Sequence, residues 1–217
     1  MASYTITSIK TGKQTEVQFE YLSKLTDELD ELSTAHKELS EFDIYKITLW
    51  KINRYPQIDP ATLKELNELR KLSEFDKERT KNILYSMLHI HGIGLAMAST
   101  YLRFTNPKIY PIIDTRALRA AFDYERTNDK EKTISDHRKS ESLYEQQIDL
   151  YIKYVNKLME FSKTDYHGLK IDFENLDRFL YDIDDDAKFA LGDKEPFNEE
   201  NITNWKNIIR KYGGKIE

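Results

Sequence analysis

Gly92-Ile93-Gly94 places two glycines around one apolar residue, between two stretches rich in apolar side chains. Glycine accepts the backbone angles of a tight turn, so this pattern predicts a sharp connection between two helices. The N–H groups at the start of the second helix would favour a phosphate group. The backbone carbonyls of Leu88, Ile90 and Ile93 are candidates to hold a monovalent cation, K⁺ or Na⁺. A Gly-x-Gly pattern by itself fits an ordinary helix connection equally well.

Asp114 is the acidic residue that could act together with this turn. The interval from Gly94 accommodates a helix to Phe104, a stop at Asn106-Pro107 and a turn over residues 110–113. Another helix is expected directly after Asp114, and an aspartate in that place commonly caps the first helical turn. Capping is therefore the simplest role of this residue.

The hairpin His91-Gly92-Ile93-Gly94 and the acid turn Pro111-Ile112-Ile113-Asp114 together resemble the helix-hairpin-helix superfamily of DNA glycosylases. This superfamily includes 8-oxoguanine, 3-methyladenine and endonuclease-III-type enzymes. Its members have a hairpin of the Leu-x-Gly-Val-Gly type and, after a similar interval, a Pro-Val-Asp turn with the essential aspartate. The match covers residues 84–118, and His91 stands where the family often has proline.

The resemblance implies a catalytic role for Asp114, at the mouth of a helix as in the family. Its carboxylate would stabilise the oxocarbenium-like sugar or orient the attacking water. The neighbouring N–H groups would help to keep this carboxylate ionised. The resemblance also implies that the hairpin backbone binds DNA, through Gly92, Ile93, Gly94, Leu95 and Ala96.

One departure from the family concerns the lysine of bifunctional members. That lysine stands two residues after the second hairpin glycine and forms a Schiff base with the sugar. This chain has Ala96 there, and no spacing supports Lys51 or Lys108 as a substitute. The resemblance therefore implies a monofunctional enzyme. The chain also has no cysteine, which excludes an iron–sulfur cluster and separates it from the endonuclease-III branch.

Other residues could contact DNA. Trp50 and Arg54 would lie one turn apart on a helix and could offer a stacking surface and a guanidinium to a flipped base or a phosphate, with Lys51 beside them. Arg116 lies within the matched segment and is a further candidate. The simpler interpretation is a core tryptophan and solvated charges. Three more bases surround the motif with the same two alternatives: Arg103, Lys108 and Arg119.

Several aromatic and acidic residues allow a functional and a structural interpretation. Aromatic side chains could line a base pocket, although their helical spacing favours the core: Tyr144, Tyr151, Tyr154, Phe161, Phe179 and Tyr181. The Asp184-Asp185-Asp186 run lacks the glycine and terminal glutamate of a calcium loop, so we expect a solvated helix end. His89 and His91 are two positions apart, which does not suit a shared metal site on a helix.

Apolar residues recur every three or four positions along most of the chain, which predicts an all-α fold. We expect helices over 22–32, 42–52, 60–72, 95–104, 115–122, 141–158, 176–183 and 205–209, and another that opens at 73–76 and runs to 88. Strand signals occur at 4–9 and 16–19, and the polar segment 123–140 is expected to be a loop. The prediction is a single helical domain over 1–217 with two lobes around a cleft, a short N-terminal β segment, and the hairpin and acid turn at 84–122.

The composition limits the function classes. The chain has 217 residues and a formal net charge of −5, which is unfavourable for DNA unless basic residues gather on one face. We find neither a signal peptide nor an apolar run of membrane-spanning length, so we expect a cytoplasmic protein without membrane contact.

The function expected from these features is a monofunctional DNA N-glycosylase, a hydrolase that excises a modified or damaged base from duplex DNA after flipping it. No cofactor would be required, apart from a structural K⁺ or Na⁺ at the hairpin. Base excision repair and removal of modified bases from foreign DNA use the same chemistry. The alternative is a non-catalytic helix-hairpin-helix module that binds DNA or protein. In a third class, a helical interaction protein, the glycine turn would be incidental.

Overall fold

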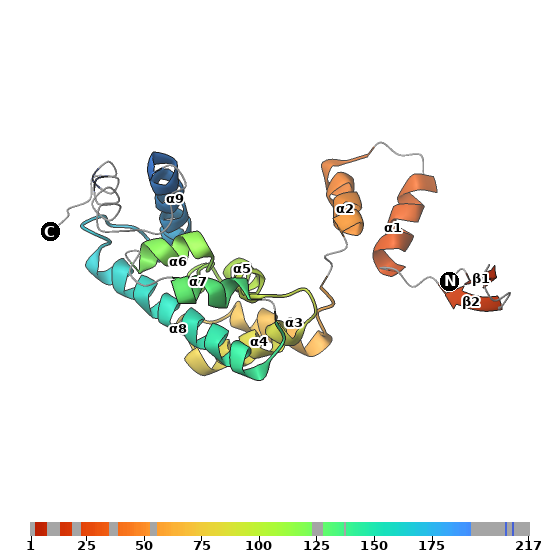
Figure 1. Cartoon of the computed structure of the whole chain (residues 1–217), viewed down its shortest axis with the longest axis horizontal. Coiled ribbons are helices and arrows are strands. Elements are labelled where there is room, and N and C mark those ends of the chain that lie inside the picture. Colours follow the sequence, from red (N-terminus) through yellow and green to blue (C-terminus); the bar gives the residue numbers. More distant parts are fainter. Residues whose placement is uncertain are drawn as a thin grey trace. The chain divides into compact units, whose positions relative to one another are not determined.

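The computed structural model describes residues 3–7, 14–18, 23–34, 39–52, 56–122, 128–136, 138–191, 207 and 210. The chain divides into two compact units, Met1–Pro56 and Gln57–Glu217 (Figure 1). The predicted hairpin and acid turn, 84–122, lie wholly in the second unit. The arrangement of two lobes around a cleft stays a prediction.

The first unit contains a β-hairpin and two helices. Strand β1 (Ser3–Thr7) pairs antiparallel with β2 (Gln14–Gln18). Helices α1 (Ser23–Thr34) and α2 (Glu41–Ile52) follow, and an ion pair of 2.9 Å joins Lys46 to Glu28. The predicted strand signals and both helices are confirmed. The apolar spacing of α2 suggests a buried face, but Phe42 on this helix is 76% exposed.

The second unit is built from helices. They are α3 (Pro60–Leu69), α4 (Lys77–His89), α5 (Leu95–Thr105), α6 (Thr115–Ala121), α7 (Asn128–Ser135), α8 (Glu141–Thr164) and α9 (Phe173–Leu191). The helical class is thus confirmed. Side-chain caps set several starts, since Asp59 accepts from Ala61 and Thr62, and Asp76 from Glu78 and Arg79. None of the helices described is long and apolar enough to cross a bilayer.

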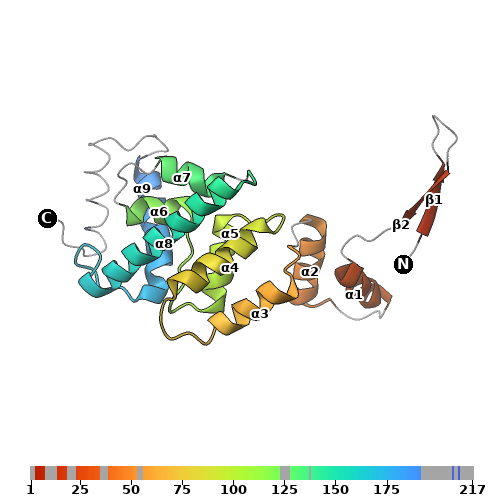
Figure 2. The same ribbon diagram turned by 90° about the horizontal axis from the view of Figure 1, so that it is seen from below.

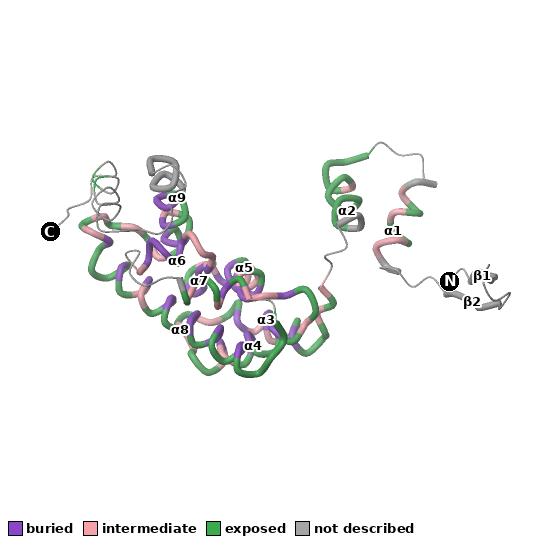
Figure 3. Tube along the Cα trace, viewed as in Figure 1, coloured by how far each residue is buried: buried purple, intermediate pink, exposed green. Residues whose placement is uncertain are grey.

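Helix α8 is the centre of the second unit, because it packs against α4, α5, α6, α7 and α9 (Figure 2). Its inner face is fully buried at Tyr151, Tyr154, Val155 and Leu158. Figure 3 shows that buried residues recur along the helices of this unit. The core therefore surrounds α8. Part of it lies between α8 and the hairpin helices α4 and α5, and part between α8 and the helices α6 and α9.

Three expectations need correction or lie outside the described residues. The segment 123–140 contains helix α7, so the predicted loop is wrong there. The apolar spacing of α3 predicts that Leu63 is buried on the same stripe as Leu66 and Leu69, but Leu63 is 52% exposed. The predicted last helix, 205–209, lies outside the described residues apart from Asn207.

A buried ion pair joins α6 to α9. The Arg119 guanidinium donates to both carboxylate oxygens of Asp184, at 3.0 and 2.6 Å, and to Glu131 at 2.8 Å. Burial alone would lower the pKa of Arg119, but the bonds to Asp184 and Glu131 raise it. Asp184 is therefore not a solvated helix end as predicted. Asp184 lies inside α9, which continues to Leu191, and it is buried because an arginine of α6 pairs with it.

Removing one member of this ion pair should lower the free energy of unfolding. In Asp184→Ala, Arg119 would keep a buried charge with Glu131 as its remaining partner, and we expect the free energy of unfolding to fall by about 3 kcal/mol. Asp129→Ala is the matched control, because Asp129 is 97% exposed and its pair with Lys132 should contribute less than about 1 kcal/mol. Urea unfolding measures both values. Equal losses in the two variants would contradict the proposed role of the pair.

Candidate active site

The hairpin turn connects α4 to α5. Helix α4 ends at His89, and Ile90 takes an extended conformation with φ −71° and ψ 133°. Gly92 has a φ of +83°, which side chains other than glycine rarely adopt, although no atom lies within 4 Å of an added Cβ. The backbone angle, and not space, therefore demands glycine at this position.

The turn faces outward while its apolar side chains face inward. His91 and Gly92 are exposed, whereas Ile93 is 1% exposed and Leu95 is fully buried. Gly94 precedes α5 as its N-cap residue and provides no side-chain cap. The first N–H groups of α5 thus have no side-chain acceptor at the cap, which suits an anion.

Ala96 occupies the second position of α5, where bifunctional glycosylases have their lysine. Its carbonyl accepts the hydroxyls of Ser99 and Thr100, at 2.8 and 2.9 Å. Because its side chain is a methyl group, Ala96 supplies no amine that could attack a sugar.

The three carbonyls predicted to hold a cation converge on a side chain from another part of the chain. The Lys139 ammonium donates to Leu88 O at 2.6 Å, to Ile93 O at 3.1 Å and to Ile90 O at 3.3 Å. Elsewhere in the described part of the chain, no group of three or more His, Asp or Glu side chains is placed to hold a metal ion.

The acid turn lies between α5 and α6, outside any helix or strand, and its N–H groups donate to side chains. Ile112 N donates to Asp177 Oδ2 at 2.8 Å, and Ile113 N donates to Ser99 Oγ at 3.1 Å. Pro111 has no N–H to satisfy. Helix α9 and helix α5 thus hold this turn through one side chain each.

Two buried tyrosines of α8 bind the carbonyls of the same turn. Tyr151 OH donates to Pro111 O and Tyr154 OH to Ile112 O, both at 3.0 Å. Burial raises the pKa of both phenols, so they remain donors over the whole physiological range. The core prediction for these two aromatic residues is confirmed, and their hydroxyls have a further role in positioning the acid turn.

Asp114 ends the acid turn and caps α6. Its Oδ1 accepts a hydrogen bond of 2.8 Å from Ala117 N. Burial raises the pKa of Asp114, and the bonds from Ala117 and Arg116 N–H groups lower it by less. The N–H groups help to keep the carboxylate ionised, as expected, but burial outweighs them and makes this carboxylate a stronger base than an ordinary aspartate.

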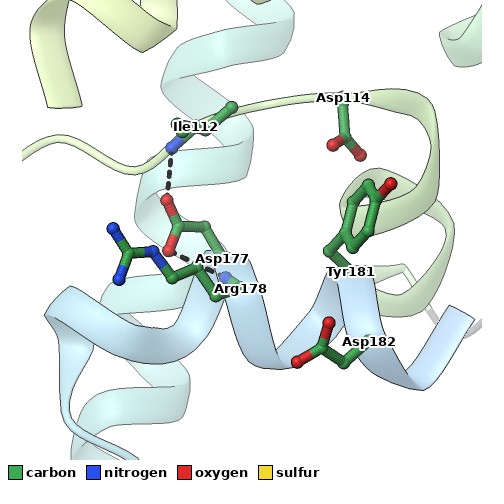
Figure 4. A pocket seen from close by; sticks show the side chains of 6 residues that line it. All are labelled: Ile112, Asp114, Asp177, Arg178, Tyr181 and Asp182. Atoms are coloured by element: carbon green, nitrogen blue, oxygen red, sulfur yellow. Dashed lines mark hydrogen bonds between the residues drawn. The ribbon is translucent and has the colours of Figure 1, made fainter. Parts of the chain in front are cut away.

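A pocket of about 360 Å³ lies between the acid turn and α9. Ile112 and Asp114 line it from the turn, and α9 contributes Asp177, Arg178, Tyr181 and Asp182. In Figure 4 the Asp114 carboxylate points toward α9, close to the Tyr181 ring. The volume lies in the range of small-molecule sites, about 300–1,000 Å³.

Buried charge supports one wall of this pocket. Arg103 Nε lies 3.4 Å from Asp177 Oδ2, and Arg103 Nη2 donates to Glu174 O at 2.5 Å. The side chains of Arg103 and Asp177 are 8% and 2% exposed. Arg103 and Arg119 are thus structural and not available to DNA, whereas Lys108 is exposed.

Arg116 holds the aromatic side of the pocket. Its Nη1 donates to Tyr181 OH at 2.7 Å, and its guanidinium carbon lies 4.7 Å from the centre of the Tyr181 ring. Tyr181 is the one predicted aromatic candidate that lines the pocket; Tyr144, Phe161 and Phe179 pack in or against the core instead.

Helix α5 joins the hairpin to the acid turn. It begins at Leu95, next to the N–H groups that suit a phosphate, and Ser99 bonds to the turn directly before Asp114. Four residues of helix span only about 6 Å along its axis. The start of α5 and the residue that accepts from Ile113 N are therefore about 6 Å apart along the helix axis.

Three further predicted contacts, Trp50, Lys51 and Arg54, belong to the first unit. Trp50 and Lys51 belong to α2, but their side chains and the whole of Arg54 lie outside the described residues. Sequence reasoning missed Asp177, Arg178 and Asp182. Their spacing along α9 places them near Tyr181, but nothing in the sequence indicates which helix faces Asp114.

No protein-family model, curated protein or solved structure matches this chain. The similarity to glycosylases therefore rests on the hairpin and the acid turn.

The Ser99 hydroxyl should be essential for the acid turn. Ser99→Ala leaves the buried Ile113 N–H without an acceptor, so we expect a loss of about 1–3 kcal/mol in unfolding free energy. Ser162→Ala makes the same change at an exposed hydroxyl that also donates to a carbonyl, and its effect should stay within about 0.5 kcal/mol. Denaturant unfolding compares the two. A Ser99 loss as small as the Ser162 loss would show that Ser99 does not hold the turn.

The Asp114 carboxylate should reduce stability at neutral pH. A folded-state pKa above that of the unfolded chain means that stability falls as pH rises through the raised value. Asparagine also caps helices, so Asp114→Asn should raise Tm at pH 7 and should match the wild type at a pH low enough to protonate the acid.

Asp59→Asn is the control of opposite sign. The hydrogen bond from the Thr62 hydroxyl, followed by those from backbone N–H groups, lowers the pKa of Asp59. Its carboxylate therefore stabilises the fold at neutral pH, and this contribution is lost as pH falls. Thermal unfolding between pH 3 and 8 should show the two variants moving Tm in opposite directions at pH 7. A lower Tm for Asp114→Asn at that pH would contradict the effect of burial.

Proposed function

We propose that this protein is a monofunctional DNA N-glycosylase that excises a modified or damaged base from duplex DNA. The observation that carries the proposal is the position of Asp114, which lines the pocket while it caps α6. A helix cap explains the hydrogen bond to Ala117, but it does not require a pocket beside the carboxylate. The resemblance of the hairpin and acid turn to the glycosylases supplies the reaction.

In this mechanism the hairpin binds the DNA backbone and the target nucleotide leaves the base stack. N–H groups at the start of α5 would hold a phosphate, and the flipped nucleotide would enter the pocket beside Asp114. Leu95 and Ser99 belong to the same helix, so α5 would link the phosphate site to the acid turn through the hydrogen bond between Ser99 and Ile113. Base release then requires breaking one bond, between the sugar C1′ atom and the base nitrogen.

Asp114 acts on the sugar. As that bond breaks, positive charge develops on the sugar, and the carboxylate stabilises it. Water attacks C1′, its oxygen forms the new bond, the carboxylate accepts its proton, and the base leaves with the bonding electron pair. The raised pKa of Asp114 favours this proton transfer, since a more basic carboxylate is a better acceptor near neutral pH.

The exposed side of α9 would contact the base. Tyr181 offers a ring for stacking, and the Arg116 contacts keep that ring in place. Asp182 and Arg178 add an acceptor and a donor group at the pocket edge. Because Ala96 stands in the lysine position, the reaction would end at the abasic site without strand cleavage.

Base release from a panel of duplexes tests the proposal, each duplex carrying one modified base and abasic sites being cleaved with alkali. We expect wild-type protein to release at least one base and Asp114→Asn to lose about 10²-fold or more of that rate, as when a group stabilising the transition state is removed. Asp76→Asn is the matched control, since Asp76 also caps a helix through backbone N–H groups but lies outside the pocket. It should keep wild-type activity.

The other outcomes separate the alternatives. Binding of duplex DNA without release of any base would support the non-catalytic helix-hairpin-helix module. Absence of both binding and release would overturn the proposal in favour of an interaction protein. Strand cleavage without alkali would contradict the monofunctional mechanism.

A further inference from the structure

The Lys139 ammonium is surrounded by carbonyl oxygens of the hairpin turn. An ammonium group has three N–H donors, and Leu88 O, Ile90 O and Ile93 O accept at 2.6, 3.3 and 3.1 Å. The amine also lies 5.7 Å from the centre of the Tyr144 ring. Its donors are thus directed at the turn, although the lysine as a whole is exposed.

The ends of two helices create this group of carbonyls. Helix α4 stops at His89, so Leu88 O loses the acceptor role that a continuing helix would give it. Ile90 O accepts from Ile93 N at 3.2 Å, and Ile93 precedes the cap of α5. Converging carbonyl oxygens bind alkali cations, because they replace the hydration shell of the ion. They bind an ammonium group for the same electrostatic reason.

The residues after Lys139 fix its place. Ser140 caps α8 through Leu143 N, and Glu141 accepts from Tyr85 OH at 2.8 Å and lies 3.2 Å from His89 Nε2. The first turn of α8 is therefore attached to the last turns of α4. This attachment brings the amine to the turn before any ligand binds.

We propose that the Lys139 ammonium takes the place of an alkali cation in the hairpin, so that the turn keeps its shape without K⁺ or Na⁺. An alkali cation bound to the same carbonyls would lie in contact with the Lys139 ammonium, and the two positive charges would repel each other. Lys139 is thus a positioning residue that acts through the backbone of the turn. The extension to DNA binding rests on the proposed function, whereas the replacement of the cation does not.

Substitution of the lysine should turn the hairpin into an alkali-ion site. In Lys139→Ala the carbonyls lose their donor, and small cations can enter. We expect Tm to fall by about 4 °C in tetramethylammonium chloride, whose cation is too large, and to return toward the wild-type value in KCl, NaCl or NH₄Cl at equal ionic strength. Wild-type Tm should be the same in all four salts.

Lys153→Ala is the matched control, because Lys153 is an exposed lysine of α8. Its Tm should not depend on the cation. An unchanged Tm for Lys139→Ala in tetramethylammonium chloride would overturn the proposal, and so would a loss, or a failure to fold, that no small cation reverses. A wild-type protein that needs K⁺ or Na⁺ would overturn it as well.

Duplex binding in the same salts separates this proposal from the proposed function. Wild-type affinity, followed by fluorescence anisotropy, should be equal in KCl and tetramethylammonium chloride, whereas Lys139→Ala should bind more weakly only in the latter. If no protein binds DNA in any salt, the proposed function fails, while the Tm series still decides the role of Lys139. If DNA binds but Lys139→Ala shows no cation dependence in either assay, only the cation proposal fails.

Discussion

The acid turn belongs to no helix or strand although it lies inside a helical core, and this imposes the constraint on which the site depends. Outside a helix or sheet, buried N–H and C=O groups must find other partners. Here side chains from three helices supply them: Ser99 of α5, Tyr151 and Tyr154 of α8, and Asp177 of α9. The backbone directly before Asp114 is therefore held from three directions, and the carboxylate inherits this fixed position.

The same constraint explains why buried charge surrounds the site. Asp177 can accept from the acid turn in a buried place because Arg103 offsets its charge, and Arg119 and Asp184 connect α6 to α9 in a similar way. Buried pairs of this kind contribute little net stability compared with apolar packing. Their contribution here is geometric, since they set how α9 faces the turn that carries Asp114.

The sequence predicted the local parts of this arrangement well. Apolar spacing and the stop at Asn106 depend on neighbouring residues, and α5 has the predicted bounds to within one residue, whereas α3 ends at Leu69 and α4 begins only at Lys77. The contacts between distant segments could not be read in this way. Nothing around Lys139 indicates that its amine meets the hairpin, and an acidic run such as that at Asp184 looks solvated until its arginine partner is known.

The pocket has one wall from the acid turn and one from α9, and these two segments differ in how well they tolerate amino-acid substitutions. Asp114 and its supports are buried or partly buried and share hydrogen bonds, so most substitutions there would disturb several partners at once. Arg178, Tyr181 and Asp182 lie on the exposed side of α9, where side chains can be exchanged at little cost to folding. Selection could therefore alter which ligand the pocket accepts by changing one helix surface, while the chemistry of the acid turn remains intact.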